Sequence, residues 1–304
     1  MKYTIYELEF QTGVHFGDTA LDNTEYTFCA DTLFSALCSE AVNMSEGTLD
    51  TLLDYVHKDK LILSDAFPYM NGECYIPKPV MHISNDMDGD STIKKKYKKL
   101  QYIPVSEIDN YVNGRFDIEK FEGLNIGEAV TKVSASVRGL EDTMPYRVGV
   151  FYYKKKCGVY IIVGYDEDSI KDFTEMLLES LSYSGIGGKR SNGLGRFTFH
   201  SKKLPAELSE RLGHCGNKCM TLSVALPKEN EIEYAMDGAT YIIDKRSGFV
   251  ASETYSDTYM RKKDLYVFKS GACFTHMFNG DVYDVSCGGR HPVYRYAKPF
   301  FMEV

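Results

Sequence analysis

The 304-residue sequence has no tryptophan, and its eight cysteines are scattered without a paired spacing. Such cysteines exclude a disulfide framework and indicate a protein that stays in the reducing cytoplasm. No apolar run approaches the roughly 18 residues that a membrane-spanning helix needs. The N-terminal sequence MKYTIYELEF alternates like a strand and lacks the apolar centre of a signal peptide. The sequence therefore predicts a cytoplasmic protein without a membrane span.

A net positive charge is also lacking, because the formal net charge is −8 at pH 7. This balance argues against a free-standing, non-specific nucleic-acid binder, whose affinity comes from neutralising phosphates. Any contact with RNA or DNA would therefore have to use a local basic surface. The hydrophobic content of 43% suffices for real cores, and the length favours two domains.

Glycine is concentrated in one stretch, Ser184 to Phe199, which reads SGIGGKRSNGLGRFTF. Its five glycines are Gly185, Gly187, Gly188, Gly193 and Gly195. Glycine permits positive φ angles and close backbone approach, and Lys189, Arg190 and Arg196 suggest an anionic partner such as phosphate. A turn that only lets a helix and a strand pack closely is an equally good interpretation of the residues alone.

Two familiar phosphate-binding motifs are absent from this glycine loop. A Walker A loop needs Ser or Thr after its Gly-Lys pair, but Arg190 follows Lys189. A dinucleotide fingerprint follows a strand and opens a helix. Here the apolar periodicity from Ile170 to Leu181 predicts a helix before the loop, and the alternation from Leu194 to His200 predicts a strand after it. The loop is therefore expected to join a helix to a strand.

A second candidate is His15, in the loop Gly13–Asp18 that follows a predicted strand at residues 2–10. Histidine is the usual general acid or base near neutral pH. No companion nucleophile or carboxylate forms an identifiable motif with His15. A structural or RNA-contacting role is therefore favoured over catalysis.

The first half of the chain shows further helix and strand patterns. Helices are expected at Asp31–Val42 and Thr48–His57. The Asn71-Gly72 turn predicts a hairpin that joins Leu61–Phe67 to Cys74–Ile76. Residues 81–127 are polar and charged and are interpreted as an insertion. Its lysine run, 94–99, is typical of a solvated helical face, although lysines around a tyrosine also suit a nucleic-acid backbone.

Residues 129–147 form an extended arm that is expected to fold back on itself. Val148–Tyr153 and Val159–Tyr165 are then expected to pair as strands, ahead of the helix and the glycine loop. The resulting order is βαββαβ, an α+β, ferredoxin-like arrangement with decorations. The expected N-terminal domain spans residues 1–203.

A second, strand-rich unit is predicted at residues 218–304, beyond a polar boundary at 204–218. Near its start lie His214, Cys215 and Cys219. A structural zinc site needs four ligands, usually from two clusters, and no second cluster is present. These cysteines are therefore expected to be reduced and without metal, and no cofactor is predicted.

Five segments together carry a resemblance to a known family. They are HFGD at 15–18, ADTLFSAL at 30–37, YIPKPV at 75–80, GIGGKRSNGLGRF at 185–197 and HPVYRYAKPFF at 291–301. In this order and spacing, over nearly the whole chain, the sequence resembles the RAMP proteins of CRISPR effector complexes, in particular the fourth subunit of the type III-A Csm complex. The long segment at 81–127 departs from the family pattern.

The resemblance implies two ferredoxin-like, RRM-like domains, an inserted thumb hairpin at about 129–147, and a non-catalytic role. The subunit would hold the 5′ repeat-derived tag of the guide RNA and bridge the large signalling subunit to the backbone RAMP subunit in antiviral defence. The implied RNA-binding residues are His15, Phe16, Lys132, Arg138, Arg147, Gly185, Gly187, Gly188, Lys189, Arg190, Ser191, Asn192, Gly193 and Arg196. Two other functions compete with this one. They are a RAMP-fold endoribonuclease that processes guide precursors with a loop histidine, and a scaffold without RNA contact.

Overall fold

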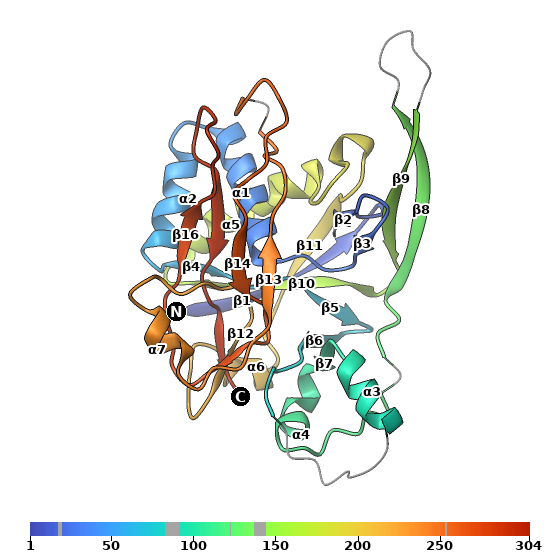
Figure 1. Ribbon diagram of the computed structural model, residues 1–304, viewed down its shortest axis with the longest axis vertical. Coiled ribbons are helices and arrows are strands. Elements are labelled where there is room, and N and C mark those ends of the chain that lie inside the picture. Colours follow the sequence, from blue (N-terminus) through green and yellow to red (C-terminus); the bar gives the residue numbers. More distant parts are fainter. Residues whose placement is uncertain (18–19, 83–90, 122, 137–143, 253) are drawn as a thin grey trace.

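The computed structural model describes residues 1–17, 20–82, 91–121, 123–136, 144–252 and 254–304. The fold is a mixed α+β fold with antiparallel sheets (Figure 1). None of the helices in these ranges is long and apolar enough to cross a membrane.

The largest sheet has seven strands and is organised around the N-terminal strand β1 (Lys2–Phe10). Its order is β11 (Phe197–Lys202), β1, β10 (Cys157–Tyr165), β5 (Phe67–Met70), β6 (Glu73–Pro77) and β7 (Tyr102–Pro104), and β4 (Leu61–Leu63) also pairs with β10. All of these pairings are antiparallel. The predicted strand at residues 2–10 is confirmed. It lies between β10, which precedes the helix before the glycine loop, and β11, which follows the loop.

Three helices cover one face of this sheet: α1 (Ala30–Met44), α2 (Thr48–His57) and α5 (Asp168–Ser184). The alternation of β1 explains how the sheet has two buried faces. Tyr6 and Leu8 pack into the core that contains the helices, whereas Ile5 packs into a second core on the opposite face. The two helices predicted in the first sixty residues are confirmed, since α1 and α2 cover both predicted ranges.

The C-terminal part of the chain supplies much of the second core. There Met220 and Phe300 pack in one cluster with Tyr160 and Ile162 of β10. The C-terminal strands are β12 (Cys219–Thr221), β13 (Ile243–Arg246), β14 (Leu265–Phe268), β15 (Cys273–Phe274), β16 (Asp281–Asp284), β17 (Tyr294–Ala297) and β18 (Phe301–Glu303), with short helices α6 (Ala206–Ser209) and α7 (Ile232–Met236). They form one three-stranded sheet, β15-β12-β18, and two hairpins, β13-β14 and β16-β17.

The polar segment at 81–127 is partly built into the fold. Its elements are α3 (Ser91–Lys99), β7, a 3-10 turn (Val105–Glu107) and α4 (Ile108–Val112). The strand β7 extends the large sheet beyond β6, and Ile103, Ile108 and Tyr111 are buried in the second core. The α3 lysines are exposed, which agrees with the interpretation as a solvated helical face.

Two predicted strand pairings are wrong. Leu61–Phe67 is not one strand, because β4 ends at Leu63 and the hairpin through Asn71-Gly72 joins β5 to β6. The strand predicted at 148–153 is part of β9 (Met144–Tyr153), which pairs with the preceding strand β8 (Gly127–Ser136) and not with β10. The reason is that β10 already bonds β1 along one edge and β4 and β5 along the other.

A buried carboxylate ties α1 to the C-terminal hairpins. Asp31 accepts hydrogen bonds from Arg246 Nη2 at 2.8 Å and from Arg295 Nη1 at 2.7 Å. Burial disfavours the Asp31 carboxylate, but the guanidinium groups outweigh that effect and hold its pKa below the ordinary value. Removing one member of such a group leaves an uncompensated buried charge, which is strongly destabilising.

A second buried carboxylate joins the same regions, and within the described part of the chain it forms no ion pair with a cationic side chain. Asp65 Oδ1 accepts hydrogen bonds from the Ala30 amide at 2.7 Å and the Val224 amide at 3.1 Å. Burial raises the pKa of Asp65 to about 6, although these donors and the Ser270 hydroxyl favour the charged form. At neutral pH the folded protein therefore holds a charge that burial penalises.

We expect Asp65→Asn to stabilise the protein above about pH 6. The folded-state pKa, about 6, exceeds the roughly 3.9 of an unfolded aspartate, so stability is lost as the pH rises through this interval. Asparagine keeps an acceptor oxygen and carries no charge. The gain should be about 2 to 3 kcal/mol near neutral pH and vanish below about pH 4, as measured by urea unfolding across this range. An equal gain in stability at neutral pH and below about pH 4 would contradict this account.

Candidate nucleic-acid interface

The glycine loop connects the end of α5 to β11, as its flanking patterns predict. Gly185 ends the helix with φ +83° and donates its amide to Leu181 O at 2.7 Å. Lys189 has φ +58°, and a 3-10 turn follows at Arg190–Asn192. Gly193 closes this turn with φ +81°. The loop is therefore a compact run of turns, with several residues in the left-handed region.

The loop backbone packs directly against the segment that follows β1. The Gly188 amide donates to His15 O at 2.8 Å, and the Gly195 amide donates to Gly13 O at 3.0 Å. A Cβ on Gly187 would stand 2.7 Å from His15 O, and one on Gly195 would stand 2.1 Å from Ile186 O. Close packing is thus a real requirement for these glycines. Gly193 differs, because a Cβ there would meet nothing within 4 Å.

The structure places the side chains of His15 and Phe16 in the interior, under the loop. His15 Nδ1 lies 2.7 Å from Gly149 O, and a Cβ on Gly188 would stand 2.6 Å from His15 Cδ2. Phe16 packs edge-on against Phe28 with ring centroids 5.0 Å apart. These two predicted RNA-contacting side chains therefore support the loop from below, and neither projects from it.

The basic side chains of the loop differ in their exposure and in whether a carboxylate or an aromatic ring lies next to their charge. Arg190 Nη1 lies 3.7 Å from Glu40 Oε1, and Glu40 is itself nearly buried. Lys189 Nζ lies 4.6 Å from the centroid of the Tyr146 ring and 3.4 Å from its hydroxyl. Arg196 is exposed. Lys189 and Arg196 are therefore the stronger candidates for contact with an anion.

An open cavity of about 540 Å³ lies between the loop and the C-terminal end of α1. It is lined by Glu40, Asn43, Ser184, Gly187, Lys189, Arg190 and Ser191. Asn192 is exposed next to it, in the same turn. The lining combines hydroxyl, amide and cationic groups with the Glu40 carboxylate, whose oxygens accept hydrogen bonds from Ser180 and Ser184 and lie near Arg190. This polar lining suits a phosphate better than an apolar ligand, with Lys189 as the cation that no carboxylate neutralises among the lining residues.

The predicted arm is a long hairpin made of β8 (Gly127–Ser136) and β9 (Met144–Tyr153), which projects away from the body in Figure 1. Its register runs from Gly127 opposite Tyr153 to Ser136 opposite Met144. This hairpin brings Lys132 and Tyr146 onto one face, where Lys132 Nζ lies 5.0 Å from the Tyr152 ring centroid.

The other two predicted arm residues do not join this face. Arg147 is exposed and pairs with Val133 on the opposite face of the hairpin. Arg138 lies outside the described residues. The face that meets the glycine loop therefore presents lysine and tyrosine side chains.

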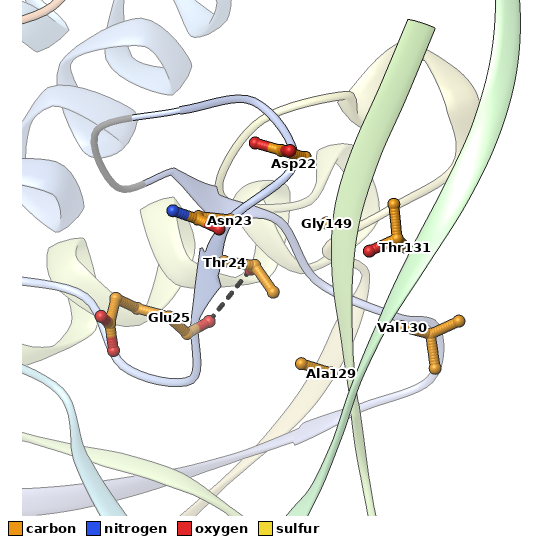
Figure 2. Close-up of a pocket in the computed structure, with 8 residues that line it drawn as sticks. All are labelled: Asp22, Asn23, Thr24, Glu25, Ala129, Val130, Thr131 and Gly149. Carbon is orange, nitrogen blue, oxygen red and sulfur yellow. Dashed lines mark hydrogen bonds between the residues drawn. The ribbon is translucent and has the colours of Figure 1, made fainter.

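A second cavity, of about 350 Å³, lies on the opposite side of the hairpin base (Figure 2). Its lining comes from the hairpin and from the segment that contains β2 (Phe16–Gly17) and β3 (Thr24–Glu25). The charged residues of this lining are Asp22 and Glu25, whose carboxylates are directed away from the hairpin strands in Figure 2. Lysine and arginine line the first cavity and not this one.

Sequence reasoning missed three residues that shape the site: Glu40, Tyr146 and Gly149. Glu40 lies about one helical turn after Leu37, on the apolar face of α1. A glutamate on an apolar face indicates that a cation or a hydrogen-bond donor packs against it, and this signal was available in the sequence. Tyr146 and Gly149 carry no comparable local signal. Their roles depend on which segment the hairpin meets.

No group of three or more His, Cys, Asp or Glu side chains that could hold a metal ion occurs among the residues the structure describes. Near the cysteines tested for zinc, Cys219 Sγ donates to Phe274 O at 3.6 Å and Cys215 Sγ to Thr275 O at 3.9 Å. Burial raises the pKa of the Cys219 thiol, which disfavours the thiolate that a metal would need.

Two protein-family models match the chain. The model of the RAMP superfamily matches residues 7–198, and that of the CRISPR Csm4 C-terminal domain matches residues 214–304. Two crystal structures resemble the fold at 18% identity: a Csm3-Csm4 subcomplex of the type III-A CRISPR-Cas interference complex (TM-score 0.67, 99% of both chains covered), and a Csm1-Csm4 cassette in complex with AMPPNP (TM-score 0.64, 100% and 98%).

Curated relatives extend over the same length. The CRISPR system Cms protein Csm4 of Mycobacterium tuberculosis is 36% identical over 305 residues, covering 99% of this chain and 98% of that protein. The protein of the same name from Streptococcus thermophilus is 37% identical over 313 residues, covering 100% and 99%. Identity at this level over full length shows common family membership. The chain therefore belongs to the RAMP superfamily and, within it, to the Csm4 proteins of CRISPR systems.

Proposed function

We propose that this protein is the non-catalytic subunit of a type III-A CRISPR effector ribonucleoprotein that binds the 5′ repeat-derived tag of the guide RNA. The observation that carries the proposal is the junction of the glycine loop with the hairpin. There Lys189 lies against Tyr146 beside an open polar cavity, in a chain that is acidic overall. A single strand is bound by such local combinations of cations and aromatic rings.

Side chains carry the phosphate contact in this proposal. The amides of Gly188, Asn192, Gly193 and Gly195 donate to carbonyl groups of the protein itself. They are therefore engaged in shaping the loop, and the Lys189 ammonium and the Arg196 guanidinium supply the attraction for phosphate. The Tyr146 ring offers a stacking surface for a base on the same face of the hairpin.

The partners follow from the family. The Csm4 proteins of the similar structures were crystallised with Csm3 and with Csm1. We infer that this chain likewise bridges a large signalling subunit and a backbone RAMP subunit, in antiviral defence. The finer fold assignment is two ferredoxin-like domains, at 1–203 and 218–304. The strand order β11-β1-β10-β4, with α1 and α5 on one face, supports it for the first domain.

The alternative, an endoribonuclease that uses His15, has less support. His15 is buried, its Nδ1 is engaged with Gly149 O, and its ring lies under the backbone of Gly188. A general acid or base has to reach the proton that it transfers, directly or through one water. This geometry favours a structural role for the imidazole.

We expect the purified chain to leave guide-precursor RNA intact over a neutral pH series. The reason is the enclosed position of the His15 imidazole. The measurement is gel analysis of end-labelled precursor, with His15→Ala and the metal-chelated protein in parallel. Cleavage by the unsubstituted chain that His15→Ala abolishes would establish the endoribonuclease instead.

We expect the double variant Lys189→Ala, Arg190→Ala to retain less guide RNA in the purified complex. Each lost phosphate contact should lower the slope of log affinity against log salt by about 0.7. Lys189→Ala alone should account for most of the loss, because Glu40 partly neutralises Arg190. The measurement is guide recovery at a series of salt concentrations.

The matched control for this test is Lys95→Ala, which removes an exposed lysine from α3, at the far end of the molecule (Figure 1). It should leave both recovery and salt slope unchanged. If the double variant behaves like this control, the loop is only a packing device and the subunit is a scaffold without RNA contact at this site.

A further inference from the structure

His15 makes a buried connection between the glycine loop and the hairpin. The His15 carbonyl oxygen accepts a hydrogen bond of 2.8 Å from the Gly188 amide, and His15 Nδ1 lies 2.7 Å from the carbonyl oxygen of Gly149 in β9. Since a carbonyl oxygen only accepts, Nδ1 carries the proton in this contact. The loop is hydrogen-bonded to the backbone of His15, and the hairpin is hydrogen-bonded to the side chain of His15.

Gly149 is one of the points at which the hairpin is fixed to the body. Its amide donates to Leu21 O at 2.9 Å, and a Cβ there would stand 2.5 Å from Asp22 O. Next to it, Val14 and Phe151 exchange backbone hydrogen bonds of 2.9 and 2.8 Å. Beyond this point the described part of the hairpin is mostly exposed. A small displacement at Gly149 therefore moves the outer hairpin by a larger distance.

The His15 ring has little freedom between these two segments. It is 6% exposed, and the absence of a Cβ on Gly188 is what leaves room for it, because that atom would stand 2.6 Å from Cδ2. A well-packed interior transmits displacement, since its side chains have few alternative positions. A shift of the loop at Gly188 must therefore displace the ring and, through Nδ1, the base of the hairpin.

The outer contact between loop and hairpin is of a different kind. Lys189 Nζ lies over the Tyr146 ring, within reach of its hydroxyl. A phosphate in the adjacent cavity would compete with Tyr146 for this ammonium group. Binding would then release Tyr146 for a base, and the buried His15 contact would remain as the link between the loop and the base of the hairpin.

We propose that His15 is a positioning residue that sets the direction of the hairpin on the guide RNA when the glycine loop is occupied. This inference rests on the proposed function, because it takes the loop and the hairpin to contact one RNA strand. It assigns to His15 no contact with the RNA itself. It separates two properties of the subunit, namely how tightly the guide is held and which nucleotide the hairpin meets.

The test uses the assembled complex with its guide and a photo-crosslinking phenylalanine derivative in place of Met144, which is 77% exposed and lies on the same face of the hairpin as Tyr146. With His15 present, crosslinks should concentrate on one nucleotide. His15→Leu should reduce that preference at least about fivefold, in the range of ordinary coupling energies, while guide recovery changes less than about twofold. His15→Asn should restore the single site, because its amide can donate to Gly149 O.

Two glycine variants keep the test independent of whether His15→Leu folds. Gly188→Ala places a methyl group against the His15 ring and should also spread the crosslinks. Gly47→Ala is the control: it introduces a side chain at φ +82° in the turn before α2, outside the site, and meets no neighbour within 4 Å, so the crosslink site should stay single.

The outcomes separate the two proposals. Unchanged crosslink sites in both His15→Leu and Gly188→Ala, with guide still bound, overturn the positioning role and leave the proposed function standing. If the crosslinks spread in His15→Asn as they do in His15→Leu, the positioning role is also overturned, because the substitutions then disrupt the structure in general. A complex whose guide neither crosslinks to the hairpin nor depends on Lys189 overturns the proposed function, and the positioning role with it.

Discussion

The site depends on direct contact between two stretches of backbone, residues 13–15 after β1 and the glycine loop after α5. Amides and carbonyls pair across this contact, and Cβ atoms on Gly187 and Gly195 would collide with carbonyl oxygens. Because β11 begins where the loop ends and pairs with β1, the same contact places the loop at the edge of the main sheet. The packing interpretation and the phosphate interpretation of the glycines are therefore compatible. Close packing fixes the backbone, and the fixed backbone decides where the cationic side chains stand.

Cationic side chains are unevenly distributed around the base of the hairpin, as the proposed RNA contact requires. On one side of the hairpin base, Lys189 and Lys132 lie over tyrosine rings, where the ring faces favour a cation. On the other side, Asp22 and Glu25 line the second cavity. In the proposed function, such a division would direct a single strand to one side of the hairpin without a large net positive charge. The chain as a whole keeps its formal charge of −8.

Local sequence pattern predicted α1, α2, β1 and the helix-to-strand position of the glycine loop, because periodicity and glycine spacing are properties of neighbouring residues. It did not predict which strands pair. The strand at 148–153 bonds β8, and β4 and β5 share one edge of β10, and both choices depend on residues far away in the chain. The same limit applies to the site. The loop's basic residues were evident, but the RNA role came from family resemblance, and Glu40 and Tyr146 acquire their roles only through tertiary contacts.

The Asp31 network imposes an order on the biogenesis of the protein. Asp31 lies in the first turn of α1, whereas its partner Arg295 follows 264 residues later, in β17. A carboxylate cannot be buried at low cost before its cations arrive, so the start of α1 has to stay hydrated while the ribosome makes the rest of the chain. We therefore expect the packing around the start of α1 to be completed only after the C-terminal strands have left the ribosome. Until then, the surface that α1 shares with β17 in the folded protein would be exposed.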